Sequence, residues 1–267
     1  MCEGLKCTIC GEKLPPSSTV TLDGHQCYIQ PCTGDDQLDE KLIFYDFESL
    51  VGQNDVHVPF LVCAKTLTGA ELSAYGLDCV RQFLLHFRRP CYRGDTFIAH
   101  NGRGYNSYLI LNVVWQLGIK PSLITQGSKI LCFTDCDFGL KFIDSLSMMP
   151  KALGFSDHTK GFFPHRFSSK LNFKYVGPFP SPSYYSVELI SPSEQGEFYS
   201  WYREACKGAF NFHEQSLLYC KNDVDILFRG CVKFREQFFN ETHVDPPKMH
   251  HNRIGLYEGF YYQLSSA

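Results

Sequence analysis

Two carboxylates, Asp46 and Glu48, stand two residues apart in the apolar stretch LIFYDFESL at 42–50. An apolar run of this length bounded by charge predicts a buried strand. Residues two apart on a strand point to the same face, so both carboxylates would lie together, with Phe47 on the opposite face. Like charges at the end of an apolar strand are costly unless a cation neutralises them, and oxygen ligands suit a hard divalent ion. A solvated edge strand is the alternative interpretation of this pair.

A third carboxylate lies far along the chain, in the longest helix candidate at 213–239. Tyr219 and Asp223 are four residues apart and would share one helix face, whereas Asp225 would point elsewhere. The pattern predicts a hydroxyl beside a carboxylate. The exposed polar face of an amphipathic helix would give the same pattern.

The stretch AHNGRGYNSYLI at 99–110 has the order strand, turn and helix start. Asn101 can fix such a turn with its side chain, and Tyr105 and Asn106 would then lie near the helix N-terminus. A plain strand-to-helix connection with an asparagine cap is the alternative.

The first 40 residues hold four soft metal ligands in two pairs, Cys7 with Cys10 and His25 with Cys27. A Cys-x2-Cys pair followed by a second pair is typical of tetrahedral zinc. The second pair is more tightly spaced than usual, so incidental thiols remain the alternative to a zinc site.

The order of expected elements predicts an α/β sheet with helices on its faces. Residues 59–67 would form a hairpin with the first strand. The other expected elements are helices at 77–87, 105–118, 197–206 and 213–239, a strand at 96–100 and several strands within 122–146. We expect three segments: a Cys/His-rich segment at 1–40, the α/β domain at 41–240 and an irregular tail at 241–267.

Composition limits the function further. Twenty-five basic against 28 acidic residues give a net charge of −3, which excludes a globally basic nucleic-acid coat but allows a local basic groove. No apolar run approaches the roughly 20 residues of a membrane span, and MCEGLKCTIC has no secretory pattern. We therefore expect reduced thiols and an intracellular protein of the nucleus or cytoplasm. Seven cysteines in apolar segments should be core residues: Cys63, Cys79, Cys91, Cys132, Cys206, Cys220 and Cys231.

Taken together, the three motifs resemble the 3′–5′ exonuclease domain of family B DNA polymerases. The resemblance implies a ribonuclease H-like fold and the variant of the site that carries a tyrosine in the third motif. The motif residues would be Asp46 and Glu48 in the first motif, Asn101, Gly104, Tyr105 and Asn106 in the second, and Tyr219 and Asp223 in the third.

Several stretches are similar to the protein-primed polymerases of DNA transposons and adenovirus-like elements: AHNGRGYNSYLI, DSLSMMP, KGFFPH and YVGPFPSPSYY. This resemblance implies that Ser145 and Leu146, with Asn101 and Tyr105, contact single-stranded DNA. It also implies that Lys160, followed by Phe163, supplies a lysine near the catalytic site.

The chain departs from the family at one metal-binding position. The resemblance implies a site for two Mg²⁺ or Mn²⁺ ions held by Asp46, Glu48 and Asp223, together with an aspartate where this chain has Asn106. The amide removes one negative charge, so we expect activity to fall by orders of magnitude.

The resemblance fades near residue 245, and the residues after it contain no acidic palm motif. We therefore expect a chain truncated before the polymerase domain and unable to polymerise.

Three functions are consistent with these residues: an impaired metal-dependent exonuclease on single-stranded DNA 3′ ends, an inactive domain that binds single-stranded DNA or a protein partner, and a related nuclease acting on RNA. We expect stacking on Tyr105, Phe47 and aromatics at 160–185. Basic residues that could line a groove are Arg103, Lys129, Lys151, Lys160, Arg166 and Lys170.

Overall fold

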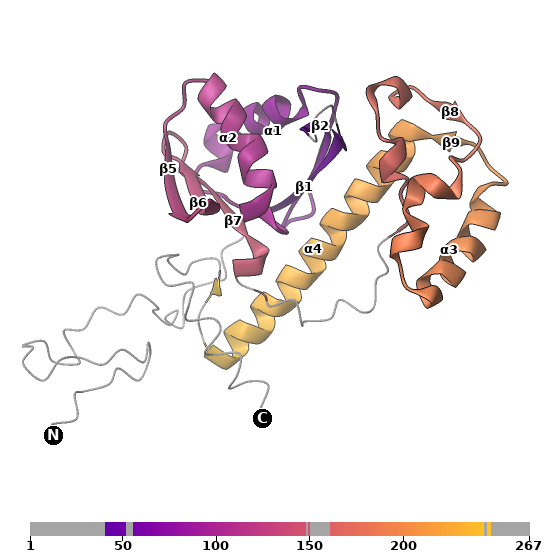
Figure 1. Ribbon diagram of the computed structural model, residues 1–267. Coiled ribbons are helices and arrows are strands. Elements are labelled where there is room, and N and C mark those ends of the chain that lie inside the picture. The colour runs from indigo at the N-terminus through magenta and orange to yellow at the C-terminus, as the bar shows by residue number, and fades with distance from the viewer. Residues whose placement is uncertain (1–40, 52–55, 148, 150–160, 243–244, 247–267) are drawn as a thin grey trace, which may run out of the picture. The chain divides into compact units, whose positions relative to one another are not determined.

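The computed structural model describes residues 41–51, 56–147, 149, 161–242 and 245–246 (Figure 1). The described chain divides into two compact units, one reaching as far as Gly230 and the other beginning at Cys231. The larger unit holds all the described residues of the candidate site.

The larger unit is built on one mixed sheet of seven strands in the order β3-β2-β1-β4-β7-β6-β5. The parallel pairs are β1 with β4 and β4 with β7, and all the other neighbours are antiparallel. The expected hairpin between the first two strands is confirmed. The strands are β1 (Leu42–Val51), β2 (His57–Thr66), β3 (Glu71–Tyr75), β4 (Thr96–Ala99), β5 (Pro121–Gln126), β6 (Lys129–Asp135) and β7 (Leu140–Asp144).

One face of the sheet is covered by the helices α1 (Cys79–Phe87) and α2 (Asn106–Gln116) (Figure 1). Both helices bury an apolar stripe against alternate strand residues, as amphipathic helices do. Aromatic rings make up much of this core: Phe142 stacks on Phe97 at 4.5 Å and on Phe133 at 4.2 Å between ring centroids. The side chains of Tyr45 and Phe47 belong to the same core, so this face of β1 is fully committed to packing.

The other face of the sheet packs against α4 (Phe212–Thr242). Phe44 of β1 meets Phe228 of α4 edge to face, with ring centroids 5.2 Å apart. Lys65 of β2 forms an ion pair with Asp225 of α4, with 2.6 Å between Nζ and Oδ1. The helix is therefore fixed across β2 and across β1, the strand that carries the first acidic motif.

Residues 161–211 form an aromatic-rich stretch that follows the seven sheet strands and precedes α4 in the sequence. It contains the short antiparallel pair β8 (Val176–Gly177) and β9 (Phe210–Asn211) and the helix α3 (Pro192–Ala205). The helix starts five residues before the expected position of 197, because Ser191 and Glu194 form a capping box at its N-terminus. Tyr185, Val187 and Phe198 form a small core of their own in this stretch.

In the second unit, the described residues include a buried ion pair between Arg235 and Asp245, whose two nitrogen–oxygen contacts are both 2.6 Å. Helix α4 extends to Thr242, three residues past its expected end.

The expected α/β class, a mixed sheet flanked by helices, is confirmed. One part of the sequence prediction is wrong: Cys91 and Cys206 are exposed, because they lie beyond the ends of α1 and α3 rather than on their packed faces. None of the helices in the described ranges has the length and apolar character that crossing a membrane requires.

Candidate metal and nucleic-acid site

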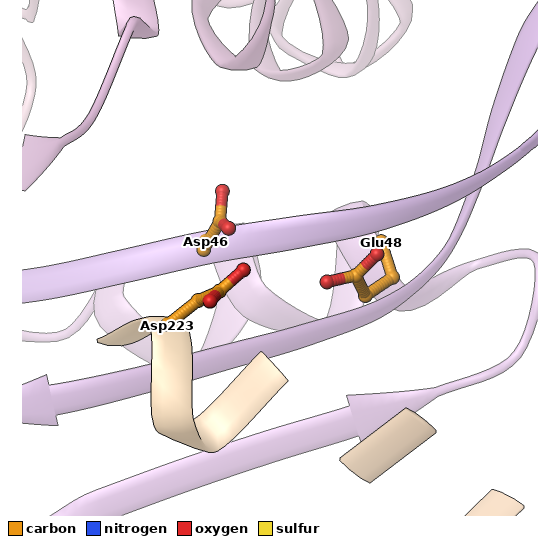
Figure 2. Close-up of side chains that lie close together, drawn as sticks. All are labelled: Asp46, Glu48 and Asp223. Atoms are coloured by element: carbon orange, nitrogen blue, oxygen red, sulfur yellow. The ribbon is translucent and has the colours of Figure 1, made fainter. Parts of the chain in front are cut away.

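Three carboxylates from two elements meet at one place: Asp46 and Glu48 of β1 and Asp223 of α4 (Figure 2). Each offers an oxygen atom that lies within 4.8 Å of the other two. Glu48 is buried, and the other two are half-buried. The structure therefore joins two sequence motifs that are 175 residues apart in the chain.

The alternation of β1 explains how two of these carboxylates share a face. Phe44, Asp46 and Glu48 point toward α4, whereas Tyr45 and Phe47 point into the core under α1 and α2. The register of β1 against β2 shifts directly after Glu48, and the pairing then continues to Val51. Phe47 is only 4% exposed, so its expected role in stacking on nucleic-acid bases is wrong.

Helix α4 is tied to β1 one turn before its acidic residue. The Cys220 thiol donates to the backbone carbonyl oxygen of Asp46, with 3.5 Å between sulfur and oxygen. The neighbouring Cys63 thiol, burial and the charges of Glu48 and Asp46 raise the pKa of Cys220, so it stays a protonated donor. Because Cys220 and Asp223 are three residues apart on a helix, this bond also places Asp223 near β1.

Asn106 is the first residue of α2 and the fourth member of the cluster. Its Nδ2 donates to Oδ1 of Asp46 at 3.1 Å, and the side chain is only 1% exposed. Reversing the amide would set two acceptor oxygens against each other, so the carboxylate dictates this orientation. Oδ1 of Asn106 has no hydrogen-bond partner among the described residues.

The donor set suits a hard divalent cation. Three clustered carboxylates and a buried amide oxygen without a partner offer oxygen ligands alone, as Mg²⁺ and Mn²⁺ prefer. Carboxylates this close repel one another unless a proton or a cation intervenes. The residues present therefore fit a hard divalent cation, as the sequence predicted.

Tyr219 lies one turn before Asp223 on α4 and is held by two rings. Phe163 stacks on it with centroids 5.0 Å apart and an interplanar angle of 27°, and His165 meets it edge to face at 5.3 Å. Its side chain is buried. The residues that fix Tyr219 thus come from the stretch that follows residue 160.

Asn101 and Tyr105 flank the turn between β4 and α2. Asn101 adopts a left-handed conformation with φ of 55°, which asparagine tolerates better than most residues. The Tyr105 hydroxyl is 3.3 Å from Nδ1 of His57. Burial, with the charges of Glu48 and Asp46, raises the pKa of Tyr105, so its hydroxyl remains protonated at neutral pH beside the cluster.

Ser145 and Leu146 lie in a short 3-10 turn, Ser145–Ser147, directly after β7. Ser145 Oγ is 3.0 Å from Nδ1 of His100, and the Leu146 N–H donates to Oδ1 of Asp144 at 2.9 Å. Asp144 was not among the residues predicted from the sequence. Its position at the end of an apolar strand, beside a predicted DNA-contacting element, was the signal that could have identified it.

Six predicted residues lie outside the described part of the chain and stay predictions: Lys151, Lys160 and the four zinc candidates Cys7, Cys10, His25 and Cys27.

Comparison with known proteins defines the class. The family model for type B DNA polymerases of organellar and viral origin matches residues 88–250, more than half of the chain. The chain therefore belongs to the organellar and viral family of type B DNA polymerases. The matched residues include Asn106, Tyr219 and Asp223, whereas Asp46 and Glu48 lie before them.

Two curated relatives are fungal. A DNA polymerase of Kluyveromyces lactis is 24% identical over 234 residues, covering 76% of this chain and 23% of that protein. A probable DNA polymerase of Ascobolus immersus is 23% identical over 223 residues, covering 75% of this chain and 18% of that protein. The chain thus spans less than a quarter of the length of these relatives.

Two solved structures are also similar. Phi29 DNA polymerase complexed with primer-template DNA and incoming nucleotides gives a TM-score of 0.49 at 14% identity, covering 86% of this chain and 35% of that one. The family B DNA polymerase of Pyrobaculum calidifontis gives a TM-score of 0.42 at 13% identity, covering 80% of this chain and 27% of that one.

Proposed function

We propose that the larger unit is a metal-dependent 3′–5′ exonuclease domain for single-stranded DNA ends, strongly impaired by Asn106. The observation that carries the proposal is the convergence of Asp46, Glu48 and Asp223 within 4.8 Å. Membership of a polymerase family supports DNA as the substrate rather than RNA.

The metal ligands in this proposal are Asp46, Glu48 and Asp223. Bound Mg²⁺ or Mn²⁺ would supply activation of water and stabilisation of charge on the leaving 3′ oxygen. Asp46 accepts the hydrogen bond of Asn106 and also lies in the carboxylate cluster, so it would be the ligand close to every other member of the site.

Asn106 weakens the site in two ways. It adds no negative charge to the three carboxylates, and its N–H occupies Oδ1 of Asp46, an acceptor that a metal would otherwise use. Carboxylate ligands set the affinity and placement of hard cations, so the loss of one ligand and the partial occupation of another should act together.

The remaining residues would bind and position the strand. Tyr219 keeps a fixed ring next to Asp223 because Phe163 and His165 hold it. Tyr105 presents a protonated hydroxyl beside the cluster. Asn101, Ser145 and Leu146 lie in the two turns that end β4 and β7, where they would contact the single strand.

The second candidate is a catalytically inactive domain that binds single-stranded DNA or a protein. The bond between Asn106 and Asp46 favours it, since the hydrogen bond supplies part of the neutralisation that a cation would otherwise give. Where the ligand is single-stranded DNA, the two candidates differ only in whether the strand is cleaved.

A cleavage assay on 5′-labelled single-stranded DNA tests the proposal. We expect slow release of 3′ nucleotides in Mn²⁺ or Mg²⁺, none in EDTA and none for Asp223→Asn. Binding of the strand without any cleavage, even with large amounts of enzyme, would favour the inactive candidate. Cleavage that persists in Asp223→Asn would contradict the assigned site.

A further inference from the structure

Arg103, in the turn between β4 and α2, forms an ion pair with Asp144, the last residue of β7. The backbone N–H of Arg103 donates to Oδ2 of Asp144 at 3.2 Å, and Nε of the guanidinium lies 3.4 Å from the same oxygen. Asp144 is only 1% exposed. One buried carboxylate therefore fixes both the backbone and the side chain of Arg103.

The other oxygen of Asp144 holds a second turn. Its Oδ1 accepts the N–H of Leu146, in the 3-10 turn after β7. The two turns can meet because β4 and β7 are parallel neighbours, with Ala99 opposite Asp144. Gly102 lies against both strand ends, since a Cβ there would be in ordinary contact with Ala99 Cβ at 3.5 Å and with the carbonyl oxygen of Ile143 at 3.7 Å.

The guanidinium keeps unused donors despite this fixation. Neither Nη1 nor Nη2 of Arg103 makes a hydrogen bond with the described residues, and its side chain is 28% exposed. Arg88 and Arg166 differ, because Nη2 of each makes a close ion pair, with Asp137 and Glu188 respectively. A guanidinium group that is fixed in position and partly exposed can donate two parallel N–H hydrogen bonds, which matches the geometry of a phosphate group.

The location connects this guanidinium group to the carboxylate cluster. Arg103 precedes Asn106 by three residues, so their Cα atoms are at most about 11 Å apart. Asn106 in turn contacts Asp46. A strand whose 3′ end reached the carboxylates would therefore pass within reach of Arg103.

We propose that Arg103 binds a backbone phosphate of the single-stranded DNA and that Asp144 is the residue that positions it. The inference rests on the proposed function and adds a substrate-binding residue to that site. Asp144 acts on the strand only through Arg103 and the two turns. The contact would be independent of base sequence, since it reads phosphate alone.

Binding of a fluorescein-labelled oligothymidylate, followed by fluorescence anisotropy over a series of NaCl concentrations, tests this proposal. Loss of one phosphate contact should lower the slope of log affinity against log salt by about 0.7. We expect Arg103→Met to show this drop and a weaker affinity. Arg103→Lys should recover the slope but only part of the affinity, because an ammonium lacks the two parallel N–H donors.

Asp144→Asn should also weaken binding. Its amide has a single acceptor oxygen for the two backbone N–H groups of Arg103 and Leu146, and its own NH2 group would face whichever N–H is left without an acceptor. Circular dichroism checks its folding, and the variant Arg103→Met, at a partly exposed position, carries the test should Asp144→Asn fail to fold. Matched controls are Arg81→Met, an exposed arginine of α1, and Asp137→Asn, the partner of Arg88.

An Arg103→Met slope equal to that of wild type, or to that of Arg81→Met, would overturn the inference and leave the nuclease proposal intact. Failure of wild type to bind the oligothymidylate would overturn both. A slope drop in Arg103→Met alone among the arginine variants would support the assignment, whether or not the chain cleaves DNA.

Discussion

The side-chain amide of Asn106 donates a hydrogen bond to the Asp46 carboxylate, with 3.1 Å between Nδ2 and Oδ1. An aspartate in the place of Asn106 would set two carboxylates at that separation, an arrangement that needs a proton or a cation. The amide thus lowers the repulsion within the cluster when no metal is bound. It also leaves the cluster with one negative charge fewer for binding a cation.

Asn106→Asp should make the stability of the chain depend more strongly on metal. Without divalent ions the variant should melt at a lower temperature than wild type, because four carboxylates repel one another. Adding Mn²⁺ should stabilise it more than wild type, since tighter binding raises the linkage term RT ln(1 + [L]/Kd). Thermal melts in EDTA and in Mn²⁺ measure both effects, and equal metal-induced shifts would count against the amide's assigned role.

Asp223→Asn should remove most of the affinity for Mn²⁺, because it leaves two of the three clustered carboxylates. Asp225→Asn is the matched control on the same helix. It breaks the ion pair with Lys65 and should lower stability by about 1 kcal/mol or less, since that pair is partly exposed, while metal binding is retained. Titration calorimetry with Mn²⁺ compares the two, and similar losses in both variants would argue against a specific role for Asp223.

The sequence predicted most of the sheet because its central strands are continuous apolar runs bounded by charge or turn residues. It missed β3 (Glu71–Tyr75), since ELSAY has only weak strand character and is ordered by pairing with β2 and by packing of Ala74 in the core. It also placed the start of α3 too late, although Ser191, Pro192 and Glu194 form a recognisable N-terminal signature.

The sequence likewise predicted only part of the candidate site. Strand and helix periodicity placed Asp46, Glu48 and Asp223 on the faces that the structure gives them, and left Asp225 outside the cluster. The sequence could not show that Asn106 bonds to Asp46 or that Asp144 joins two turns, because both contacts depend on the parallel pairing of distant strands.

The buried thiol of Cys79 should cause the free energy of unfolding to decrease in alkaline solution. Burial raises its pKa from 9.0 to about 12, so between these values the unfolded chain has lost a proton that the folded chain keeps. The free energy of unfolding should therefore decrease by up to about 1.4 kcal/mol per pH unit over this range from this group. Urea denaturation at several pH values should show a flatter dependence for Cys79→Ala. The exposed Cys91→Ala is the control, and an identical pH dependence in the two variants would contradict the assignment.

The rate of 3′ nucleotide release by Asn106→Asp, compared with wild type in Mg²⁺, tests the central claim most directly. The account predicts an increase of at least about a hundredfold, equivalent to roughly 2.7 kcal/mol of transition-state stabilisation. The double variant Asn106→Asp with Asp223→Asn should lose this gain, because the new carboxylate acts only within the cluster. Equal rates for wild type and Asn106→Asp, or a gain that survives the loss of Asp223, would show that these residues do not form the metal-binding centre of a nuclease.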